Sequence, residues 1–171
     1  ILRLNREYSQ LFDETFAQLV RELKDAHIHI INERELTSSQ EEEVLSFFMD
    51  KINGFTNPIF INSPTFNPEQ HLKESLYLAV VLWHDQEEPE TVHEVALLEV
   101  PVRELGRFFR LRDKDGESYL MFLDDVIRYC LPYIFIGREY VQYEAYTFKF
   151  TKDAEFEIEQ DLRSSVIEKV S

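Results

Sequence analysis

The amino-acid sequence predicts an α+β fold in which helices flank a mainly antiparallel sheet. Apolar residues recur with helical spacing over residues 4–25, at the start of the chain. Strand patterns cluster in the middle of the chain, and most of them are joined by connections of hairpin length. Short connections let consecutive strands pair antiparallel, whereas parallel pairing needs a longer crossover. These observations together are typical of an α+β domain.

The first predicted helix covers residues 4–25 and carries its apolar side chains on one face. A short segment rich in β-branched residues follows at 27–31 and predicts a strand. The periodic apolar positions of the helix are Leu4, Tyr8, Leu11, Phe12, Phe16, Leu19, Val20 and Leu23.

A second helix is predicted to begin at Thr37 or Ser38. Either hydroxyl, followed by Glu41 and Glu42, has the pattern of a capping box. The apolar spacing behind this cap continues until Asn53-Gly54, a pair that typically ends a helix. The sequence therefore predicts one helix between the cap and this pair.

The centre of the chain is predicted to be rich in strands. Residues 55–72 contain three prolines and predict a long loop with one short strand at 59–61. Nearly continuous apolar runs at 76–83 and 95–100 predict buried strands on either side of an acidic turn segment. We expect these two strands to lie in the same sheet.

A β-hairpin is predicted over residues 108–123. Its strands are expected at 108–111 and 119–123, and Asp115-Gly116 lies between them. Asp-Gly is a strong turn signal because both central positions of a tight hairpin turn need a left-handed backbone, which aspartate and glycine adopt more readily than most residues. The hairpin is therefore the most local pairing in the expected sheet.

The last third of the chain is predicted to return to helix and strand. Asp124 or Asp125 is expected to cap a helix that Pro132 kinks or shortens. Alternating residues at 140–151 predict another strand, and residues 162–170 predict a final helix. The expected order is helix, strand, helix, loop, sheet, helix, strand, helix.

The charge of the chain limits its partners. The formal net charge is −15, so the surface repels nucleic acids and anionic lipid at long range. The single cysteine, Cys130, excludes an intramolecular disulfide and fits a reducing cytosol. No apolar stretch reaches membrane-spanning length, and no export signal opens the chain. We therefore expect a cytoplasmic protein with no nucleic-acid partner and no membrane span.

Both ends of the sequence interrupt a helical pattern. Ile1 leads directly into the first helix, and Ser171 closes the last one without a glycine or proline stop. We therefore expect one domain, 1–171, that belongs to a longer chain.

Four stretches resemble the polyphosphate kinase family. Each motif alone is weak, but their order and spacing together are fairly specific. An upstream segment, His27 to Leu36, is also similar to the family's "GIHLLRYDEL" segment. The four stretches are Leu76 to Val80 ("LYLAV"), Glu99 to Leu111 ("EVP" followed by "RFFRL"), Phe122 to Ile127 ("FLDDVI") and Thr151 to Ile158 ("TKDAEFEI").

This resemblance implies a head domain, the middle domain of the family, with a fold similar to PX modules. In the family this domain helps to form the dimer and frames a tunnel for ATP and polyphosphate. The family transfers the terminal phosphate of ATP reversibly to polyphosphate through a phosphohistidine. The implied partners are the other domains of the same polypeptide and a second subunit, in a homodimer or higher homo-oligomer.

The resemblance also implies that the chemistry lies outside this chain. No stretch matches the family's phosphohistidine or its ATP and magnesium ligands, so no catalytic, cofactor-binding or metal residue is assigned here. The helix within 1–25 would join the domain to a preceding N-terminal domain, and the catalytic C-terminal domains would follow it. Residues 61–66 diverge from the family's His-Pro-Phe-Pro-rich stretch, which leaves the role of that loop open.

One basic stretch is a candidate anion-facing patch. Guanidinium groups suit phosphate oxygens, and Arg110 and Arg112 would project on one side of a strand. The alternative is a solvated or interface face that is paired with acidic neighbours, and a chain of this charge favours the alternative. The patch consists of Arg103, Arg107, Arg110 and Arg112, with Lys114 nearby.

Histidines and acids offer weaker candidates. His27 and His29 have the spacing of two zinc ligands on a strand, but no third ligand is near them in sequence. Acids alternate over 153–161 and would share one face, where solvation or docking is favoured over metal binding. Cys130 lies on an apolar helix face, which favours a buried thiol over a nucleophile.

Two other functions remain open from the sequence. One is a standalone PX-like protein- or lipid-binding module, although the acidic charge disfavours phosphoinositides. The other is a small metal-dependent hydrolase, for which the acidic row at 153–161 is the only support.

Overall fold

The computed structural model describes residues 2–84 and 93–152, which fold into two compact units. The first unit combines Ile1–Asn57 with Val100–Tyr140, and the second combines Pro58–Glu99 with Val141–Ser171. The described strands are divided between two sheets, whereas the sequence suggested one. Most of the described strand pairs are antiparallel, so the predicted α+β class is confirmed.

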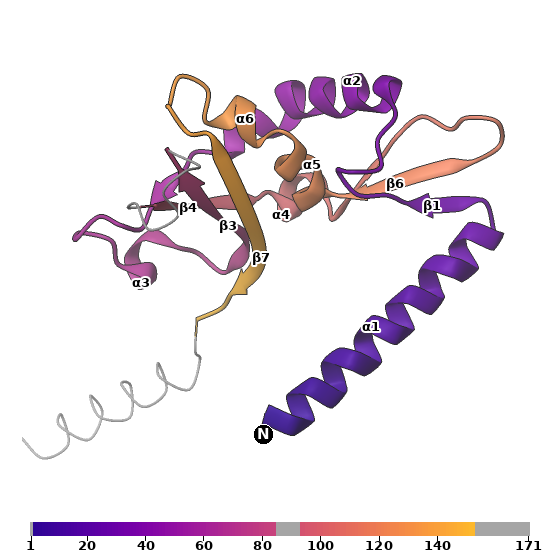
Figure 1. Cartoon of the computed structure of the whole chain (residues 1–171), viewed down its shortest axis with the longest axis horizontal. Coiled ribbons are helices and arrows are strands. Elements are labelled where there is room, and N and C mark those ends of the chain that lie inside the picture. The colour runs from indigo at the N-terminus through magenta and orange to yellow at the C-terminus, as the bar shows by residue number, and fades with distance from the viewer. Residues whose placement is uncertain (1, 85–92, 153–171) are drawn as a thin grey trace, which may run out of the picture. The chain divides into compact units, whose positions relative to one another are not determined.

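The first unit begins with α1 (Leu2–Asp25), the long indigo helix of Figure 1, which leads into β1 (Ile28–Ile30). His27 joins the two elements in a left-handed conformation, with φ of 63°. The β1 strand pairs parallel with β6 (Ser118–Phe122), and β6 pairs antiparallel with β5 (Phe108–Arg110). The three-stranded sheet therefore has the order β1-β6-β5.

The second helix, α2 (Ser38–Phe47), begins with a capping box at Thr37. The Thr37 hydroxyl accepts a hydrogen bond from the Gln40 amide, and the Gln40 side chain accepts one from the Thr37 amide. The side chain that completes the capping box is thus Gln40. The prediction that Glu41 or Glu42 completes it is wrong, because the box uses the residue three positions after the cap and the cap is Thr37. The helix continues as a π-helical turn, Phe48–Ile52, and a 3-10 turn, Asn53–Phe55.

The predicted hairpin of 108–123 is confirmed. Asp115 and Gly116 both have positive φ, 55° and 77°, as a two-residue hairpin turn requires. Lys114 and Glu117 close the turn with backbone hydrogen bonds of 3.0 and 2.9 Å. Before the hairpin lies a short helix that the sequence did not predict, α4 (Val102–Leu105).

The hairpin leads directly into α5 (Leu123–Tyr129), and α6 (Leu131–Ile134) follows. The residue before α5 is Phe122, which makes no side-chain cap. Asp124 and Asp125 therefore lie in the first turn and do not cap the helix, contrary to prediction. Pro132 lies near the start of α6, and the break at Cys130 confirms that the predicted helix is shortened.

The core of the first unit gathers around α5, which contacts β5, β6 and the π-helical turn. Val44, Phe48 and Ile52 recur every four residues and are fully buried. The Phe47 ring stacks on Phe109 with centroids 4.1 Å apart, which fastens α2 to β5. The other buried apolar residues in the described part of this unit are Ile31, Val100, Leu111, Met121, Leu123, Val126, Ile127, Cys130, Leu131 and Phe135.

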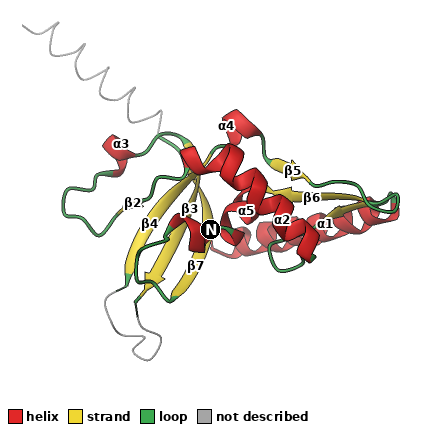
Figure 2. Cartoon of the chain, turned by 90° about the horizontal axis from the view of Figure 1, so that it is seen from above, coloured by secondary structure: helices red, strands yellow, loops and turns green. Residues whose placement is uncertain are grey.

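The second unit is a four-stranded sheet of order β2-β4-β3-β7. Figure 2 shows β4, β3 and β7 side by side, and β3 and β7 pair without interruption from Ser75↔Phe150 to Trp83↔Gln142. The short helix α3 was not predicted within the 55–72 loop, where Asn67 caps it. The elements are β2 (Ile59–Phe60), α3 (Pro68–His71), β3 (Ser75–Trp83), β4 (Glu94–Val100) and β7 (Gln142–Phe150).

Tyr77 is at the centre of one core of the second unit. It is 2% exposed and packs with Leu72 and Leu97. Its ring stacks on Phe148 across the β3–β7 pair, and its hydroxyl donates to the Lys73 carbonyl at 3.2 Å. The buried polar end of the ring is thus satisfied by backbone. The predicted helix 162–170 and the acidic row 153–161 lie outside the described residues.

Replacing Gly116 should destabilise the chain. Gly116→Ala places a Cβ on a residue with φ of 77°, which we expect to lower the free energy of unfolding by about 1 kcal/mol. Gly54→Ala is the matched control, because Gly54 has no positive φ and the added Cβ would have no heavy atom within 4 Å. Urea unfolding of both variants measures the difference, and equal effects would contradict the turn assignment.

Candidate functional site

The four arginines of the candidate patch lie along one stretch of the first unit. Arg103 is in α4, Arg107 precedes β5, Arg110 is in β5, and Arg112 follows it. Three of them pair with carboxylates: Arg107 with Asp124, Arg110 with Asp113 at 2.8 Å, and Arg112 with Glu43 at 3.4 Å. Arg103 also interacts with a neighbouring residue. Acidic side chains therefore already neutralise much of this stretch, and its role toward an anion stays a prediction.

Asp124 is the buried centre of a larger ion-pair network. It is 5% exposed, and its two carboxylate oxygens accept from Arg107 and from Arg128, the latter at 3.2 Å. Arg128 also donates to Asp125 at 2.6 Å, and the Arg107 guanidinium lies 4.8 Å from the centroid of the Phe122 ring. The network joins the start of β5 to the first two turns of α5. A buried carboxylate needs such partners because its desolvation is otherwise uncompensated.

Asp125 titrates unusually within this network. Burial, then the neighbouring Asp124 and Glu33 carboxylates, raise the pKa of Asp125 to about 6, and Arg128 opposes the shift. Two adjacent acids in the first turn of α5 thus differ in environment: Asp124 has two guanidinium partners and Asp125 has one.

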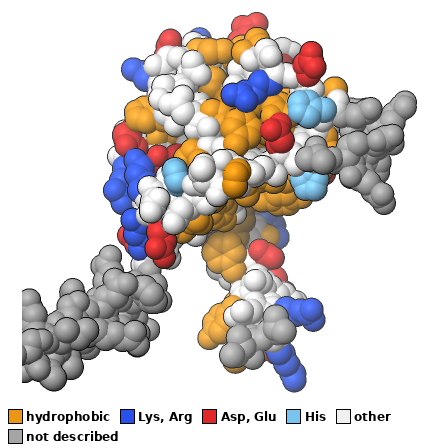
Figure 3. Space-filling view, turned by 90° about the vertical axis from the view of Figure 1, so that its left-hand side faces the viewer, with side chains coloured by type: hydrophobic (Ala, Val, Ile, Leu, Met, Phe, Trp, Pro, Cys, Tyr) orange, Lys and Arg blue, Asp and Glu red, His pale blue; other side chains and the backbone are white. Residues whose placement is uncertain are grey.

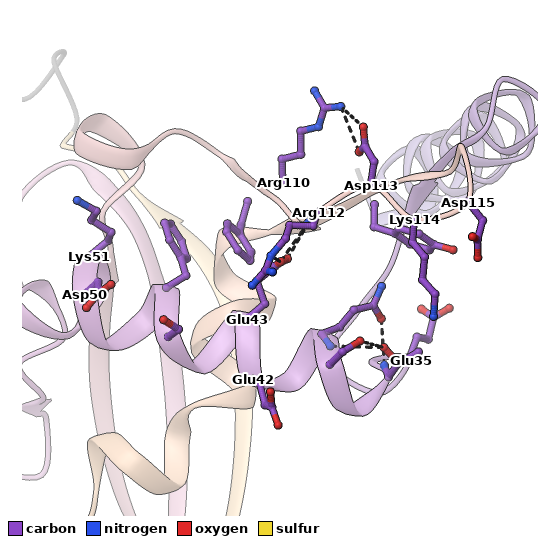
Figure 4. Close-up of a pocket in the computed structure, with 17 residues that line it drawn as sticks. Glu35, Glu42, Glu43, Asp50, Lys51, Arg110, Arg112, Asp113, Lys114 and Asp115 are labelled. Carbon is purple, nitrogen blue, oxygen red and sulfur yellow. Dashed lines mark hydrogen bonds and ion pairs between the residues drawn. The ribbon is translucent and has the colours of Figure 1, made fainter.

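A polar groove runs between α2 and the β5–β6 hairpin. It encloses about 1050 Å³ and lies entirely within the first unit (Figure 4). Arg112 reaches from the hairpin to Glu43 on α2, whereas Arg110 turns to Asp113 on its own side of the groove. Hydrogen bonds from Ser118 and then Arg110 lower the pKa of Asp113, which keeps that carboxylate charged. The charged residues that line the groove are Glu35, Glu42, Glu43, Asp50, Lys51, Arg110, Arg112, Asp113, Lys114 and Asp115.

The two histidines with zinc-ligand spacing share one carboxylate. His27 Nδ1 lies 2.9 Å from Glu117 Oε1, and His29 Nε2 lies 2.7 Å from Glu117 Oε2. Hydrogen bonds from His27 and then His29 lower the pKa of Glu117. Sequence spacing missed Glu117 because it is 88 residues from His29 and arrives only through the parallel β1–β6 pair. Among residues 2–84 and 93–152, no group of three or more His, Cys, Asp or Glu side chains is placed to hold a metal.

Comparison with known proteins identifies the family. The family model described as the polyphosphate kinase middle domain matches residues 39–171. The chain belongs to the polyphosphate kinase middle-domain family. Three of the sequence stretches that resemble the family, 76–80, 99–111 and 122–127, fall on described elements of the structure.

Curated relatives and a solved structure agree with this family. The chain is 30% identical to a polyphosphate kinase of Vibrio parahaemolyticus over 99% of its length, and 31% identical to that of Escherichia coli over 100%. It spans about a quarter of each relative, 24% in both cases. The crystal structure of a polyphosphate kinase from Porphyromonas gingivalis matches 83% of the chain and 23% of that protein, with a TM-score of 0.70 at 23% identity. The last comparison supports the fold.

One face of this middle domain mixes charges of both signs. Figure 3 shows Lys and Arg side chains next to Asp and Glu side chains, with hydrophobic side chains between them. His84 also has an acidic neighbour: its Nε2 lies 3.3 Å from the Glu94 carboxylate. None of the described helices is both long enough and apolar enough to cross a membrane.

Cys130 is buried as predicted. Its side chain is fully enclosed, and burial raises the pKa of the thiol to about 12. A thiol that stays protonated is a poor nucleophile. This environment agrees with the structural role expected from its apolar helix face.

The raised pKa of Asp125 predicts how its removal changes stability with pH. Between the ordinary carboxyl pKa near 4 and about 6, the folded chain binds more protons than the unfolded chain at this residue. The stability contributed by Asp125 therefore falls as pH rises through that window. Asp125→Asn should gain stability relative to the native chain on going from pH 4.5 to pH 6.5, by on the order of 1 kcal/mol after allowance for solvent screening.

Urea unfolding at both pH values measures this gain. Asp13→Asn, at an exposed position of α1, is the control and should show no comparable change. A stability difference for Asp125→Asn that is the same at both pH values would contradict the assigned pKa.

Proposed function

We propose that this chain acts as the architectural head domain of a polyphosphate kinase. In this proposal the whole enzyme transfers the terminal phosphate of ATP reversibly to polyphosphate, through a phosphohistidine outside this chain. The observation that carries the proposal is the match of the middle-domain model to residues 39–171. The chain spans about a quarter of relatives that are named polyphosphate kinases, which leaves most of their length for ATP, magnesium and the transfer chemistry.

The arginine environment supports this division of labour. Each of three guanidinium groups pairs with a carboxylate: Arg107 with Asp124, Arg110 with Asp113 and Arg112 with Glu43. A site that binds ATP or polyphosphate tightly would need cations free to take phosphate oxygens. Two of these pairs, Arg107 with Asp124 and Arg112 with Glu43, instead connect elements of the first unit to one another, as an architectural domain requires. The enzyme is proposed to act in the cytosol, as the reduced Cys130 and the acidic surface suggest.

The exposed face of α1 supports a role in assembly. Tyr8 and Phe12 are 70% and 69% exposed, and Leu4, Leu11 and Leu19 are each about half exposed or more. One turn further along the same face, Phe16 stacks on Phe12 with ring centroids 6.3 Å apart, and it packs against Phe122 with ring centroids 6.1 Å apart. An apolar helix face that is covered only in part favours a further protein surface over its exposed residues. We propose that a second subunit or another domain of the enzyme covers it.

An activity assay separates the architectural role from catalysis. We would measure ATP- and Mg²⁺-dependent polyphosphate synthesis by the 171-residue chain and by the Escherichia coli enzyme as a positive control. A chimera in which this chain replaces the corresponding quarter of the Escherichia coli enzyme should retain synthesis, and the chain alone should have none. Synthesis by the chain alone would contradict the proposal, as would a folded chimera without activity.

Assembly can be tested on α1 itself. Phe12→Glu places a charge in the exposed apolar face, and we expect it to weaken self-association of the chimera by about tenfold or more, which corresponds to about 1.4 kcal/mol. Ser9→Glu adds the same charge at an exposed polar position and should leave association unchanged. Light scattering over a concentration series gives the masses, and identical masses for both variants would exclude α1 from the interface.

A further inference from the structure

The β5 strand is an open edge of the three-stranded sheet. The order of the described strands, β1-β6-β5, leaves β5 paired on one side. Its backbone bonds to β6 through alternate residues: the Arg107 carbonyl accepts from Leu123, Phe109 faces Met121, and the Leu111 amide donates to Tyr119. In an antiparallel ladder the residues between these hydrogen-bonded pairs direct their N–H and C=O groups away from the partner strand. The N–H and C=O groups of Phe108 and Arg110 therefore face the open edge.

The next edge position, Arg112, already donates its backbone hydrogen bond to a side chain. The Arg112 amide follows the same alternation, and it donates to both oxygens of Glu43 at 2.7 and 3.1 Å. Glu43 belongs to α2, so a carboxylate from across the groove takes the place that a neighbouring strand's carbonyl would take. The edge amide of Arg110, which also lines the groove, continues this row, and that of Phe108 follows it at the start of β5.

The groove beside the edge has room for a further strand. It encloses about 1050 Å³ between α2 and the hairpin. The stacked rings of Phe47 and Phe109 connect its two walls. Because the Phe109 side chain faces α2, every second side chain of an added strand would face α2 as well. The alternate side chains would lie on the side of Phe108, which is 44% exposed.

The charge of the groove selects the partner. Arg110 and Arg112 are paired with Asp113 and Glu43, so these four charges cancel. The charged lining residues that remain are four acids and two lysines, which gives a net negative groove. This balance attracts a cationic segment and disfavours a phosphate chain. The four acids are Glu35, Glu42, Asp50 and Asp115, and the two lysines are Lys51 and Lys114.

We propose that this groove binds an extended peptide segment that adds a fourth strand to β5. Backbone hydrogen bonds to Phe108 and Arg110 hold the segment, basic side chains face the acids that line the groove, and apolar side chains cover Phe108. This mode of binding takes its affinity from the main chain and its specificity from alternate side chains. Such binding is a property of the chain itself and does not depend on the proposed polyphosphate chemistry.

The probe is a fluorescein-labelled ten-residue peptide of alternating lysine and valine, and the readout is fluorescence anisotropy with the intact chain. Arg110→Pro removes the edge amide, while the bonds from Phe109 and Leu111 to β6 remain. We expect about tenfold weaker binding or more for this variant. Arg110→Ala is the matched control: it removes the same side chain but keeps the amide, and because it leaves Asp113 without its cation it should bind the lysine peptide at least as tightly as the native chain.

Several results would overturn the proposal. Unchanged binding by a folded Arg110→Pro variant would show that the edge is not used, and equal binding of a glutamate-valine peptide would refute the charge argument. Binding of inorganic tripolyphosphate that Arg110→Ala abolishes, without peptide binding, would identify an anion site instead. If Arg110→Pro does not fold, the double variant Glu42→Lys and Asp50→Lys provides the test. It should lose the lysine peptide and gain the glutamate peptide, and retention of the original preference would contradict the proposal.

Discussion

The buried carboxylate of Asp124 is the constraint on which the first unit depends. Removing one partner from a buried ion pair typically destabilises a protein by about 3–5 kcal/mol, since it leaves a charge without compensation. Asp124 has partners on both sides, Arg107 before β5 and Arg128 one turn further along α5. Both guanidiniums must therefore remain in place while Asp124 is buried. This requirement holds the start of the hairpin against the helix that follows it.

The groove is a consequence of this arrangement. Once the start of β5 is held at α5, the strand runs past α2, where Phe109 stacks on Phe47 and the Arg112 amide meets Glu43. The hairpin itself is set by its Asp115-Gly116 turn, whose register brings Glu117 to His27 and His29, just after α1. Local turn geometry and one buried network thus position the edge strand, the groove and the junction with α1.

Local patterns allowed much of the fold to be predicted. The apolar runs at 76–83 and 95–100 and the Asp-Gly turn specify strands and a hairpin, because these signals act within a few residues. Interactions between distant residues could not be predicted in the same way. The local sequence predicts that Asp124 caps a helix. In the structure it is the second residue of α5 and binds Arg107, which is 17 residues away in the sequence. The division into two sheets likewise depends on pairings such as β1 with β6 that no local pattern encodes.

The candidate site shows the same limit. The sequence identified Arg103, Arg107, Arg110 and Arg112 as a basic stretch, but it did not show which carboxylates neutralise them. Glu43 and Asp124 come from α2 and α5, and their positions follow from packing around the buried core. Family resemblance, by contrast, was carried by whole segments in order, which is why the middle-domain family was predicted and confirmed although the individual site was not.

Hydrogen exchange of the Asp124→Asn variant tests the central role of this carboxylate most directly. Loss of the charge should loosen both guanidiniums and release the start of β5 from α5. We predict faster exchange at the Phe109 and Leu111 amides, which bond to β6, with no change along the β3–β7 pair of the other unit. Unchanged protection at Phe109 and Leu111 would contradict this role, and equal loss along β3 and β7 would show that Asp124 does not act on the first unit alone.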